Sequence, residues 1–573
     1  MKNSQAFKHF LSLLLAFVCA IDSAALAGGT GGGREADIVV YGDAAVGVSA
    51  AIQAARMNKS VILISQYGHL GGMTSSGLGW TDLGSSAILG GISREFYHEV
   101  YLHYARADSW DRQKKEEFRK NGQGGIPTFD RETQLASVFE PKVAEMIFDR
   151  MIRAAGVKVV EGRLDLKSGA IMKARRISAI RLEGGKEIRG KMFIDASYEG
   201  DLMAAAGVRY LVGREKNARF QESSNAITMP VHGNNLVNGI DPYLKQGDPS
   251  SGLLPGVNGF DEEDVGKGDH RLQAFCYRMC LTNDPENRVE IKKPANYDEA
   301  DYEILFRAIE TGKKKGGFFK YSPVPNLKTD SNNTGGISTD LIGGNYSDLP
   351  PDHPNYWDWT TLSHQQREEV AAKHRDWQLG LIWTLQHHKR VPEPIRKRHL
   401  AWGLAKDEFV GNDHWPYNIY VREGRRMLSD FVMTEHQCRQ NPDYPPIKDS
   451  VGMGAYTMDS HNVQRVVFKG QLKNEGDIQK PLGGRPYPIS YRAIVPREGE
   501  CENLLVPWCL SASHIAFGSI RMEPVGMVLG QSAGTAAAHA IDDEVSVQKV
   551  DYAKLRKRLL EDGQALYQKE SGQ

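Results

Sequence analysis

Residues 37–79 read DIVVYGDAAVGVSAAIQAARMNKSVILISQYGHLGGMTSSGLG. A short apolar run at 38–40 enters the glycine turn GDAAVG at 42–47. An alanine-rich segment of helical character follows to Met57, and a second apolar run occupies 61–64. Strand, tight turn, helix and strand within about 30 residues form the layout of a dinucleotide-binding βαβ unit. The stretch therefore predicts a Rossmann-type α/β fold.

The small residues of this turn suit a phosphate ligand. Gly42 permits the sharp turn, and Gly47 lets the helix pack closely on the sheet. Ala44 replaces the second glycine of the motif, a small substitute that costs some of the room in which the backbone approaches a pyrophosphate. The acidic residue expected at the end of the second strand, to bind ribose hydroxyls, is replaced by Ser65 and Gln66, which can hydrogen-bond a diol only as neutral groups. An ordinary strand–turn–helix without a ligand is the alternative.

A second glycine-rich segment, LGGMTSSGLG at 70–79, follows directly and is typical of FAD-binding rather than NAD-binding proteins. The combination resembles the FAD-dependent oxidoreductase family with a glutathione-reductase-type Rossmann domain, in the branch related to the flavin part of heterodisulfide reductase. This resemblance implies FAD as cofactor. It also implies cofactor contacts from the second segment, through Gly71, Gly72, Met73 and Ser75.

Two later segments resemble the same family. MFIDASYEGD at 192–201 corresponds to the place where the family's chain passes the pyrophosphate, which implies that Asp195 or Asp201 serves the ribityl and phosphate surroundings. A strand-to-helix turn capped by Asp201 is the alternative. Near the end, a strand at 502–508 and a helix at 527–541 resemble the elements that close the Rossmann sheet, and Gly530 and Gly534 allow close approach to cofactor or sheet.

Several polar residues are candidates for catalysis. His514 and Arg521 lie in segments that we predict to be loops facing the isoalloxazine, as acid/base and as anion stabiliser. The block YVREGRR at 420–426 supplies Arg422 and Arg425 to bind a carboxylate or the flavin edge. In YTMDSH at 456–461, Asp459 and His461 share a face if the segment is a strand. Each of these blocks could instead be structural.

The length of 573 residues predicts two or three domains. Helices over 90–120, 139–156 and 364–388 and a hairpin around 184–185 are expected from the periodicity. We predict a discontinuous Rossmann-type FAD-binding domain with an inserted mixed α+β substrate domain. The predicted divisions are a signal peptide (1–27), a Gly-rich leader (28–34), the first FAD-binding part (35–206), the insertion (207–489), the second FAD-binding part (490–542) and a helical tail (543–573).

The first 27 residues have the pattern of a cleavable signal peptide. Lys2 and Lys8 precede an apolar core at 10–20 that is too short to span a membrane, and Ala25-Leu26-Ala27 forms a small-residue cleavage site. The pattern predicts export, to the periplasm or outside the cell, without stable membrane insertion after cleavage; an uncleaved anchor is the alternative. A formal net charge of zero gives no electrostatic case for nucleic acid.

Cysteine and histidine spacing argues against metal or disulfide chemistry. Beyond the leader five cysteines remain, too few and too scattered for a disulfide framework or an iron–sulfur cluster. Cys276 and Cys280, one helical turn apart if helical, are expected to be buried small hydrophobes. No histidine pair has metal-ligand spacing, so we predict no metal. Six of the nine tryptophans fall between 357 and 415, which fits either carbohydrate stacking or an aromatic-rich packed helix.

Together these features predict an exported FAD-dependent oxidoreductase. It would transfer a hydride between a small-molecule substrate, such as a sugar or another alcohol, and flavin N5. Oxygen, a quinone or a redox protein would reoxidise the flavin. Two alternatives stay open: a non-redox enzyme that eliminates or hydrolyses sugars with a bound dinucleotide, and a non-enzymatic carbohydrate-binding or scaffold protein with a degenerate nucleotide fold.

Overall fold

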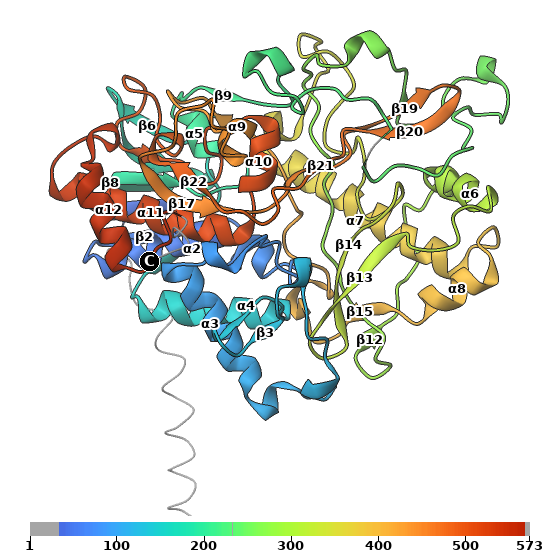
Figure 1. The fold of residues 1–573 in the computed structure, drawn as a ribbon, viewed down its shortest axis with the longest axis horizontal. Helices are drawn as coiled ribbons and strands as arrows, with labels where there is room; N and C mark the ends of the chain where they lie inside the picture. Colours follow the sequence, from blue (N-terminus) through green and yellow to red (C-terminus); the bar gives the residue numbers. More distant parts are fainter. Residues whose placement is uncertain (1–33, 232, 568–573) are drawn as a thin grey trace, which may run out of the picture.

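The computed structural model describes residues 34–231 and 233–567. The predicted signal peptide and residues 28–33 of the predicted leader lie outside this part. Two regions lie side by side in Figure 1: a βαβ region built from both ends of the chain, in blue and red, and a region of mixed helices and strands, in green and yellow. Within the described ranges, no helix has the length and apolarity needed to cross a membrane.

A seven-stranded sheet forms the centre of the first region, in the order β5-β2-β1-β8-β7-β6, with β23 pairing to β8. The first four strands and β23 run parallel, whereas β7 and β6 are antiparallel. The parallel core and its antiparallel extension make a mixed α/β sheet of Rossmann type. The strand bounds are β1 Glu35–Tyr41, β2 Val61–Ser65, β5 Lys158–Glu161, β6 Ala170–Lys173, β7 Arg176–Arg181, β8 Glu187–Asp195 and β23 Leu504–Leu505.

The strand β1 is buried because its β-branched residues fill the middle of the sheet. Ile38, Val39 and Val40 are fully enclosed, and Val39 lies in register with Ile62 on one side and Phe193 on the other. A parallel strand buried on both faces reads as a continuous apolar run, which is how this segment appears in the sequence. The hairpin predicted around 184–185 is present between β7 and β8, with both glycines at positive φ.

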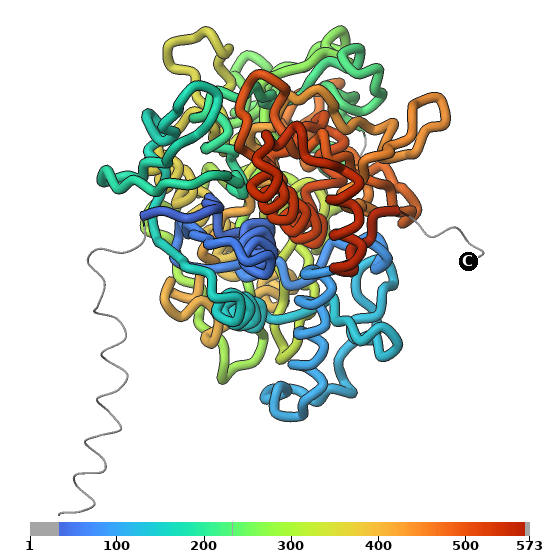
Figure 2. The backbone as a smooth tube through the Cα atoms, turned by 90° about the vertical axis from the view of Figure 1, so that its left-hand side faces the viewer, coloured from blue at the N-terminus to red at the C-terminus, as the bar shows by residue number. Residues whose placement is uncertain are grey.

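Two helices from opposite ends of the chain pack against one another beside the sheet. These are α2 (Ala45–Arg56) and α11 (Glu523–Asp542), and Figure 2 shows the blue and red helices together. A Cβ on Gly530 would lie 2.0 Å from the Val46 carbonyl oxygen, and one on Gly534 would lie 2.5 Å from that of Ala50. Both glycines therefore serve the contact between the two helices. The remaining helices of this region are α3 Gly91–Ala105, α4 Pro141–Ala154, α5 Asp201–Ala205, α9 Glu435–Cys438, α10 His514–Ile520 and α12 Tyr552–Glu561.

Three local expectations are wrong. The helix expected over 90–120 ends at Ala105, because Ser109 and the Trp110 indole donate to the carbonyls of His103 and Tyr104 and stop the helix. The strand expected over 502–508 is only two residues long. Cys276 and Cys280 are not on a helix, since 280 begins a strand and 276 bridges to Tyr420. The five described cysteines are free and buried, as small hydrophobes are.

The second region contains a five-stranded antiparallel sheet and three helices, at the right of Figure 1. Its longest helix, predicted over 364–388, begins after Ser363, whose hydroxyl accepts the N–H of Gln366 in a capping box. The bounds are β12 Arg288–Val289, β15 Gly403–Ala405, β11 Cys280–Thr282, β14 Lys328–Asn333 and β13 Phe319–Val324 in sheet order, with α6 Glu303–Glu310, α7 His364–His387 and α8 Glu393–Leu400.

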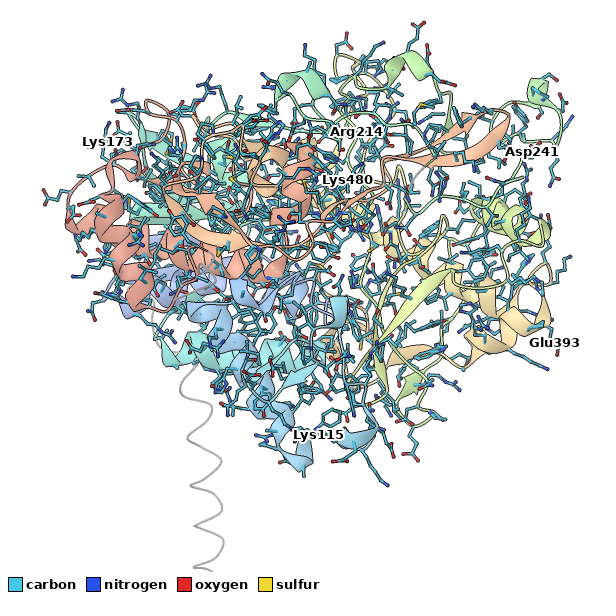
Figure 3. The ribbon with its side chains drawn as sticks, viewed as in Figure 1. Lys115, Lys173, Arg214, Asp241, Glu393 and Lys480 are labelled. Carbon is cyan, nitrogen blue, oxygen red and sulfur yellow. The ribbon has the colours of Figure 1, made fainter. Side chains whose placement is uncertain are left out.

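The remaining strands form short pairs outside the two larger sheets, all antiparallel except β10 with β19. Charged side chains such as Lys115, Lys173 and Glu393 point to the surface in Figure 3, whereas Arg214 is buried and forms ion pairs with Asp269 and Glu475 at 2.6 and 2.8 Å. The remaining strands are β3 Phe129–Asp130, β4 Leu135–Ala136, β9 Tyr210–Leu211, β10 Val257–Asn258, β16 Arg426–Met427, β17 Ser450–Gly454, β18 Met458–Ser460, β19 Gln464–Phe468, β20 Gln471–Glu475, β21 Ile478–Lys480 and β22 Tyr487–Ser490.

Candidate functional site

A narrow crevice opens at the carboxyl ends of β1, β2 and β8, where ligands bind in open α/β sheets. Gly42 lies at a φ of 115°, and a Cβ there would be 2.6 Å from the Ala196 backbone. A Cβ on Gly47 would be 2.0 Å from the Gly42 oxygen. Both positions thus require glycine. The crevice has a free volume of about 20 Å³ and is lined by Gly42, Asp43, Ala44, Gln66, Tyr67, Ala196, Ser197, Tyr198, Glu199, Asn418, Ile419 and Val421.

The second glycine segment packs against the first and forms the back of the crevice. The N–H of Gly71 donates to the Asp43 carbonyl at 2.7 Å, and a Cβ on Gly72 would be 2.9 Å from the Ala44 Cα. The N–H of Met73 donates to the Tyr198 hydroxyl, and Ser75 donates to Leu70 within its own turn. Of the predicted cofactor residues, Gly42, Ala44 and Gln66 line the crevice, whereas Gly47, Gly71, Gly72, Met73 and Ser75 lie behind its lining.

A carboxylate that we did not predict lies at the end of β2. Asp43 is in the first glycine turn, and its Oδ2 accepts hydrogen bonds from the Ser65 hydroxyl at 2.7 Å and from the N–H groups of Gln66 and Tyr67 at 2.9 and 3.2 Å. Burial raises the pKa of Asp43 against the effect of these bonds. The acid missing from the end of the strand is thus supplied by the turn. The sequence signal from which this carboxylate could have been predicted is the acidic residue inside the glycine motif.

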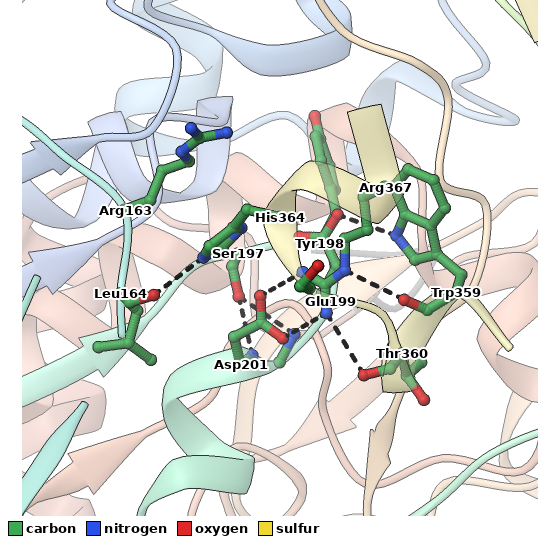
Figure 4. Close-up of polar contacts among 12 residues, drawn as sticks. Arg163, Leu164, Ser197, Tyr198, Glu199, Asp201, Trp359, Thr360, His364 and Arg367 are labelled. Carbon is green, nitrogen blue, oxygen red and sulfur yellow. Dashed lines mark hydrogen bonds and ion pairs between the residues drawn. The ribbon is translucent and has the colours of Figure 1, made fainter. Parts of the chain in front are cut away.

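The segment after β8 is held by its own hydrogen bonds and ion pairs. Asp195 accepts from the Ser197 hydroxyl and from the N–H of Met203, and burial raises its pKa to about 6. Asp201 binds Arg367 of α7 at 2.6 and 2.9 Å and Arg425 at 2.8 Å; the pair with Arg367 is drawn in Figure 4. Neither aspartate lines the crevice. Their contacts instead fix the turn and attach α7 to the sheet region.

A second hollow of about 250 Å³ adjoins the crevice and shares Tyr67 and Ile419 with it. Arg163, which follows β5, borders the hollow together with Trp359, His364 and Arg367 from the insertion. His364 contacts the Leu164 carbonyl at 2.9 Å, and the Trp359 indole donates to Glu199 at 3.2 Å (Figure 4). The crevice therefore continues past the end of β2 into a hollow between the two regions, whose wall contains several aromatic side chains.

A third cavity, of about 380 Å³, lies on the other side of the segment 418–421. The segment separates the two spaces: Asn418, Ile419 and Val421 line the crevice, whereas Tyr420 lines the cavity. Polar side chains dominate the cavity wall. The lining residues are Asp82, Gln123, Gly233, Asn234, Arg278, Lys320, Asn332, Asn333, Tyr420, Tyr456, Asp459, His461, Gln479 and Arg521.

His461 is held between two carboxylates in this cavity. Its Nδ1 lies 2.6 Å from Asp340 and its Nε2 lies 3.5 Å from Asp459. Burial and nearby Arg422 act to lower the pKa of His461, but the two aspartates outweigh them and raise it. Burial acts to raise the pKa of Asp340, but Arg422 and His461 lower it well below its usual value. The arrangement is an oriented Asp–His pair, in which Asp340 was not predicted.

Arg521 lines the same cavity at the end of α10. Its guanidinium donates to the Tyr420 hydroxyl at 2.9 Å and to the Asp459 carbonyl at 3.0 Å. His514 does not line the cavity. The loop expected at His514 is wrong, because Ser513 caps a helix that begins there. The histidine is buried between Glu423, at 2.7 Å, and Ser460, at 3.0 Å.

The other two predicted arginines lie outside the cavity wall. Arg422 is fully buried, donates to Asp340 at 2.9 Å and supports the Asp–His pair from behind. Arg425 binds Asp201 and the carbonyls of Glu199 and Thr360. Thus the tertiary structure brings Arg521, Asp459 and His461 together in one cavity, and leaves His514, Arg422 and Arg425 as buried neighbours or supports.

One group of carboxylates in the described part of the chain has the spacing of a metal site: Glu140, Asp407 and Glu408. The ammonium of Lys328 lies among them, at 2.5 Å from both glutamates and 2.9 Å from the aspartate. Lys328 thus takes the central position that a metal ion would need, and Lys142 also pairs with Glu140 and Asp407, so the geometry is that of an ion-pair network. The absence of a metal stays a prediction.

The sheet, the glycine cradle and the crevice define a Rossmann-type dinucleotide-binding protein. The profile of the family described as "FAD dependent oxidoreductase" matches residues 37–559, so the chain belongs to that family. The protein is an FAD-dependent oxidoreductase, and FAD is its cofactor. The two obligatory glycines, the turn against the end of β2 and the Asp43 carboxylate fit the adenosine diphosphate part of this cofactor. The link to heterodisulfide reductase stays a prediction.

Parts of several solved flavoenzymes are similar in structure. The L-amino acid deaminase from Proteus vulgaris matches at 16% identity with a TM-score of 0.22, over 32% of this chain and 54% of that one. L-proline dehydrogenase from P. horikoshii matches at 16% identity with a TM-score of 0.22, over 32% of this chain and 59% of that one. 3-Ketosteroid-delta4-(5alpha)-dehydrogenase from Rhodococcus jostii RHA1 matches at 18% identity with a TM-score of 0.19, over 32% of this chain and 50% of that one. The aligned part therefore spans 54% of the deaminase. Such low TM-scores carry no argument about substrate. No curated protein matches the chain.

Proposed function

We propose that the protein is exported and oxidises an alcohol carbon of a small polyhydroxylated substrate, a sugar or similar polyol. The observation that carries this proposal is the polar cavity of about 380 Å³ in which His461, between two aspartates, faces the same space as Arg521. A base that takes a hydroxyl proton and a cation that stabilises negative charge are the two groups that such an oxidation needs from the protein.

The crevice and the adjoining hollow supply the residues that would hold FAD. The turn at Gly42 and Ala44 would face the pyrophosphate, Asp43 the ribose hydroxyls, and the hollow beside Tyr67 and Trp359 the adenine. When bound, FAD supplies the hydride acceptor. Since the crevice has only about 20 Å³ of free volume, side chains such as Gln66 and Tyr67 must move outward for the dinucleotide to enter.

The cavity wall supports a substrate with many hydroxyl groups. Five amide side chains line it, and each offers both a donor and an acceptor to a hydroxyl. Three cations, two aspartates and two tyrosine hydroxyls add to them, so an apolar substrate would leave many buried polar groups unpaired. The amides are Gln123, Asn234, Asn332, Asn333 and Gln479.

His461 is the base in this scheme. Its ring takes the proton of the substrate hydroxyl at Nε2, while Asp340 holds Nδ1 and fixes the ring. The C–H hydride would leave the same carbon, so that an alcohol would become a carbonyl compound, with bound FAD as the acceptor of the two electrons. Oxygen, a quinone or a redox protein would be the final acceptor. Arg521 orients Tyr420 and adds positive charge beside the reacting atoms.

Export rests on the basic start, short apolar core and Ala25-Leu26-Ala27 of the sequence. Expression of the full chain with a reporter of cleavage tests it directly. A mature N-terminus near Gly28 in the exported fraction supports export, and an uncleaved chain retained with membranes counts against it.

Anaerobic spectroscopy of the purified protein tests the reaction. A yellow spectrum that bleaches with sugars or polyols, and not with amines or apolar alcohols, is the expected result. Bleaching by amines alone would refute the substrate class. A sugar product formed without any bleaching would support the non-redox alternative. A colourless protein unable to take up added FAD would support the non-enzymatic one.

A further inference from the structure

A cavity of about 520 Å³ lies within the insertion, away from the residues described above. Its wall shares no residue with the crevice, with the hollow beside Trp359 or with the polar cavity. Residues from the segment 296–304, from α7 and from β19 form the wall. The side chains used below are Asn296, Tyr297, Asp301, Glu303, Lys373, Asp376, Trp377 and Arg465.

Arg465 is the unusual member of this wall. Its relative exposure is 8%, and within residues 34–231 and 233–567 its guanidinium has neither an ion pair nor a hydrogen bond. Burial lowers its pKa to about 10. Arg214, another buried arginine of the insertion, has carboxylates on two sides. Because a buried cation without a counter-charge is costly, Arg465 calls for an anion from outside the protein.

The other charged groups of the wall leave room for an anion. Glu303 is already bound by Arg307 at 2.7 Å and by Arg390 at 2.6 Å. Asp376 accepts from Asn296 at 3.3 Å and lies 3.6 Å from Arg375. Asp301 is the remaining carboxylate, and the exposed Lys373 adds a second cation that offsets it. Arg465 therefore sets the charge that a ligand of this cavity has to supply, and that charge is negative.

Aromatic side chains form the more open part of the wall. Tyr297 and Trp377 are half-buried, and Tyr297 is held by stacking on Tyr302 with ring centroids 5.1 Å apart. The Tyr302 hydroxyl donates to the Trp377 carbonyl at 2.9 Å, which fixes the backbone of the tryptophan. The Tyr297 ring is covered by Tyr302 and by the Lys293 ammonium, 4.5 Å from its centroid, so the Trp377 ring is the one offered to a ligand. An aromatic face beside groups that accept hydrogen bonds, such as Asp301 and Asn296, suits the apolar face and the hydroxyls of a sugar ring.

We propose that this cavity is a second ligand site that binds an anionic sugar. The carboxylate or sulfate group of the sugar pairs with the Arg465 guanidinium, and the ring packs on Trp377. The site is separate from the flavin chemistry and does not depend on the proposed substrate of that reaction. It accounts for the half-buried tryptophan of α7 that lines the cavity.

Calorimetric titration of the holoenzyme tests the proposal. The probes are D-glucuronate, D-glucose 6-sulfate, D-glucose and sodium sulfate. We expect both charged sugars to bind, with D-glucose and sulfate alone at least tenfold weaker. The relative affinity of the two charged sugars identifies which anionic group the site prefers. Because a sugar can also enter the polar cavity, each titration is repeated with Arg465→Met, and only the binding lost in that variant is assigned to this site. If D-glucose or sulfate shares that lost binding equally with D-glucuronate, the proposal is overturned.

Variants locate the binding. Arg465→Met should weaken D-glucuronate at least tenfold, while the exposed Arg439→Met, as a matched control, leaves it unchanged. Trp377→Ala should weaken the sugars but not sulfate, which keeps the test open if Arg465→Met fails to fold. His461→Gln should leave D-glucuronate binding intact, and Arg465→Met should leave flavin bleaching by an active polyol intact. Unchanged D-glucuronate affinity in both Arg465→Met and Trp377→Ala would refute the site.

Discussion

The Asp43 carboxylate and the Ser65 hydroxyl form a hydrogen bond of 2.7 Å between the first glycine turn and the end of β2. The two residues are 22 positions apart and exchange the usual roles of a Rossmann unit, in which the strand end carries the acid and the turn is neutral. The hydrogen bonds from Ser65, Gln66 and Tyr67 all go to Asp43 Oδ2, and the residue lines the crevice. It is therefore placed to accept a ribose hydroxyl.

Asp43→Asn should weaken FAD binding. Loss of a charge-assisted hydrogen bond of about 1.5–3 kcal/mol corresponds to roughly a tenfold to hundredfold rise in Kd. Fluorescence quenching of FAD by the apoprotein measures it. Asp37→Asn, at the opposite end of β1 and bonded to Ser60 and Lys191, is the matched control. An unchanged Kd in Asp43→Asn would show that the carboxylate serves only the strand end.

The rate of flavin reduction should rise with pH as His461 loses its proton. The folded pKa of this histidine is raised above 6.5 by Asp340 and Asp459, so the base is protonated and inactive at low pH. Asp340→Asn removes one negative charge, which lowers that pKa and moves the acidic limb to lower pH. Stopped-flow reduction across the pH range measures both curves.

His461→Gln should slow reduction by about 10²–10⁴-fold. His436→Gln, on the short helix α9 and away from the cavity, provides the control for loss of a histidine. If the acidic limb of the pH–rate profile lies at the same pH in Asp340→Asn as in the wild type, and His461→Gln reduces the flavin at the normal rate, the proton transfer belongs to another group.

Asp201→Asn should destabilise the apoprotein as well as the holoenzyme. The substitution leaves Arg367 and Arg425 buried beside a neutral amide, and breaking a buried ion pair costs about 3–5 kcal/mol. Denaturant unfolding measures the loss, with the exposed Asp108→Asn as control at about 0–1 kcal/mol. A loss seen only when FAD is bound would instead give Asp201 a direct part in holding the cofactor.

Glu523 should make the protein less stable as pH rises through the weakly acidic range. Burial raises the pKa of this carboxyl to about 7, although the Tyr198 and Thr74 hydroxyls act to lower it. Between pH 4.5, the ordinary value, and about 7 the folded state holds more protons than the unfolded state. The free energy of unfolding therefore falls with rising pH there, by up to about 3 kcal/mol.

Thermal unfolding of Glu523→Gln at several pH values isolates this effect. The variant keeps a neutral group of the same shape, so the difference from the wild type should shrink as pH falls below 4.5. Parallel stability curves for the two proteins from pH 4.5 to 7 would mean that Glu523 ionises normally.

The sequence alone was sufficient to predict those elements whose conformation depends on residues close together in the chain. A β-branched run followed by a glycine turn and an alanine-rich helix can be recognised locally, because strand burial, positive φ and helix packing each act within a few residues. The segments around 195, 505 and 530 were assigned to the same region through their resemblance to the FAD-dependent oxidoreductase family. Local patterns failed at 106–120, where side chains of Ser109 and Trp110 end a helix that charge and periodicity alone would extend.

Only the tertiary structure decided what the polar residues do. His461 and Arg521 are far apart in the chain and line one cavity, where Asp340 holds His461 from behind the wall. Asp201 and Arg425 pair with each other and do not line the crevice. An ionisable side chain acts according to the charges around it, and those come from distant segments. The sequence by itself thus determined the nucleotide fold and its FAD cofactor. Folding decided that the carboxylate of the glycine turn lies at the end of β2, that His461 of the Asp–His pair faces the cavity, and that Arg465 is buried without a counter-charge.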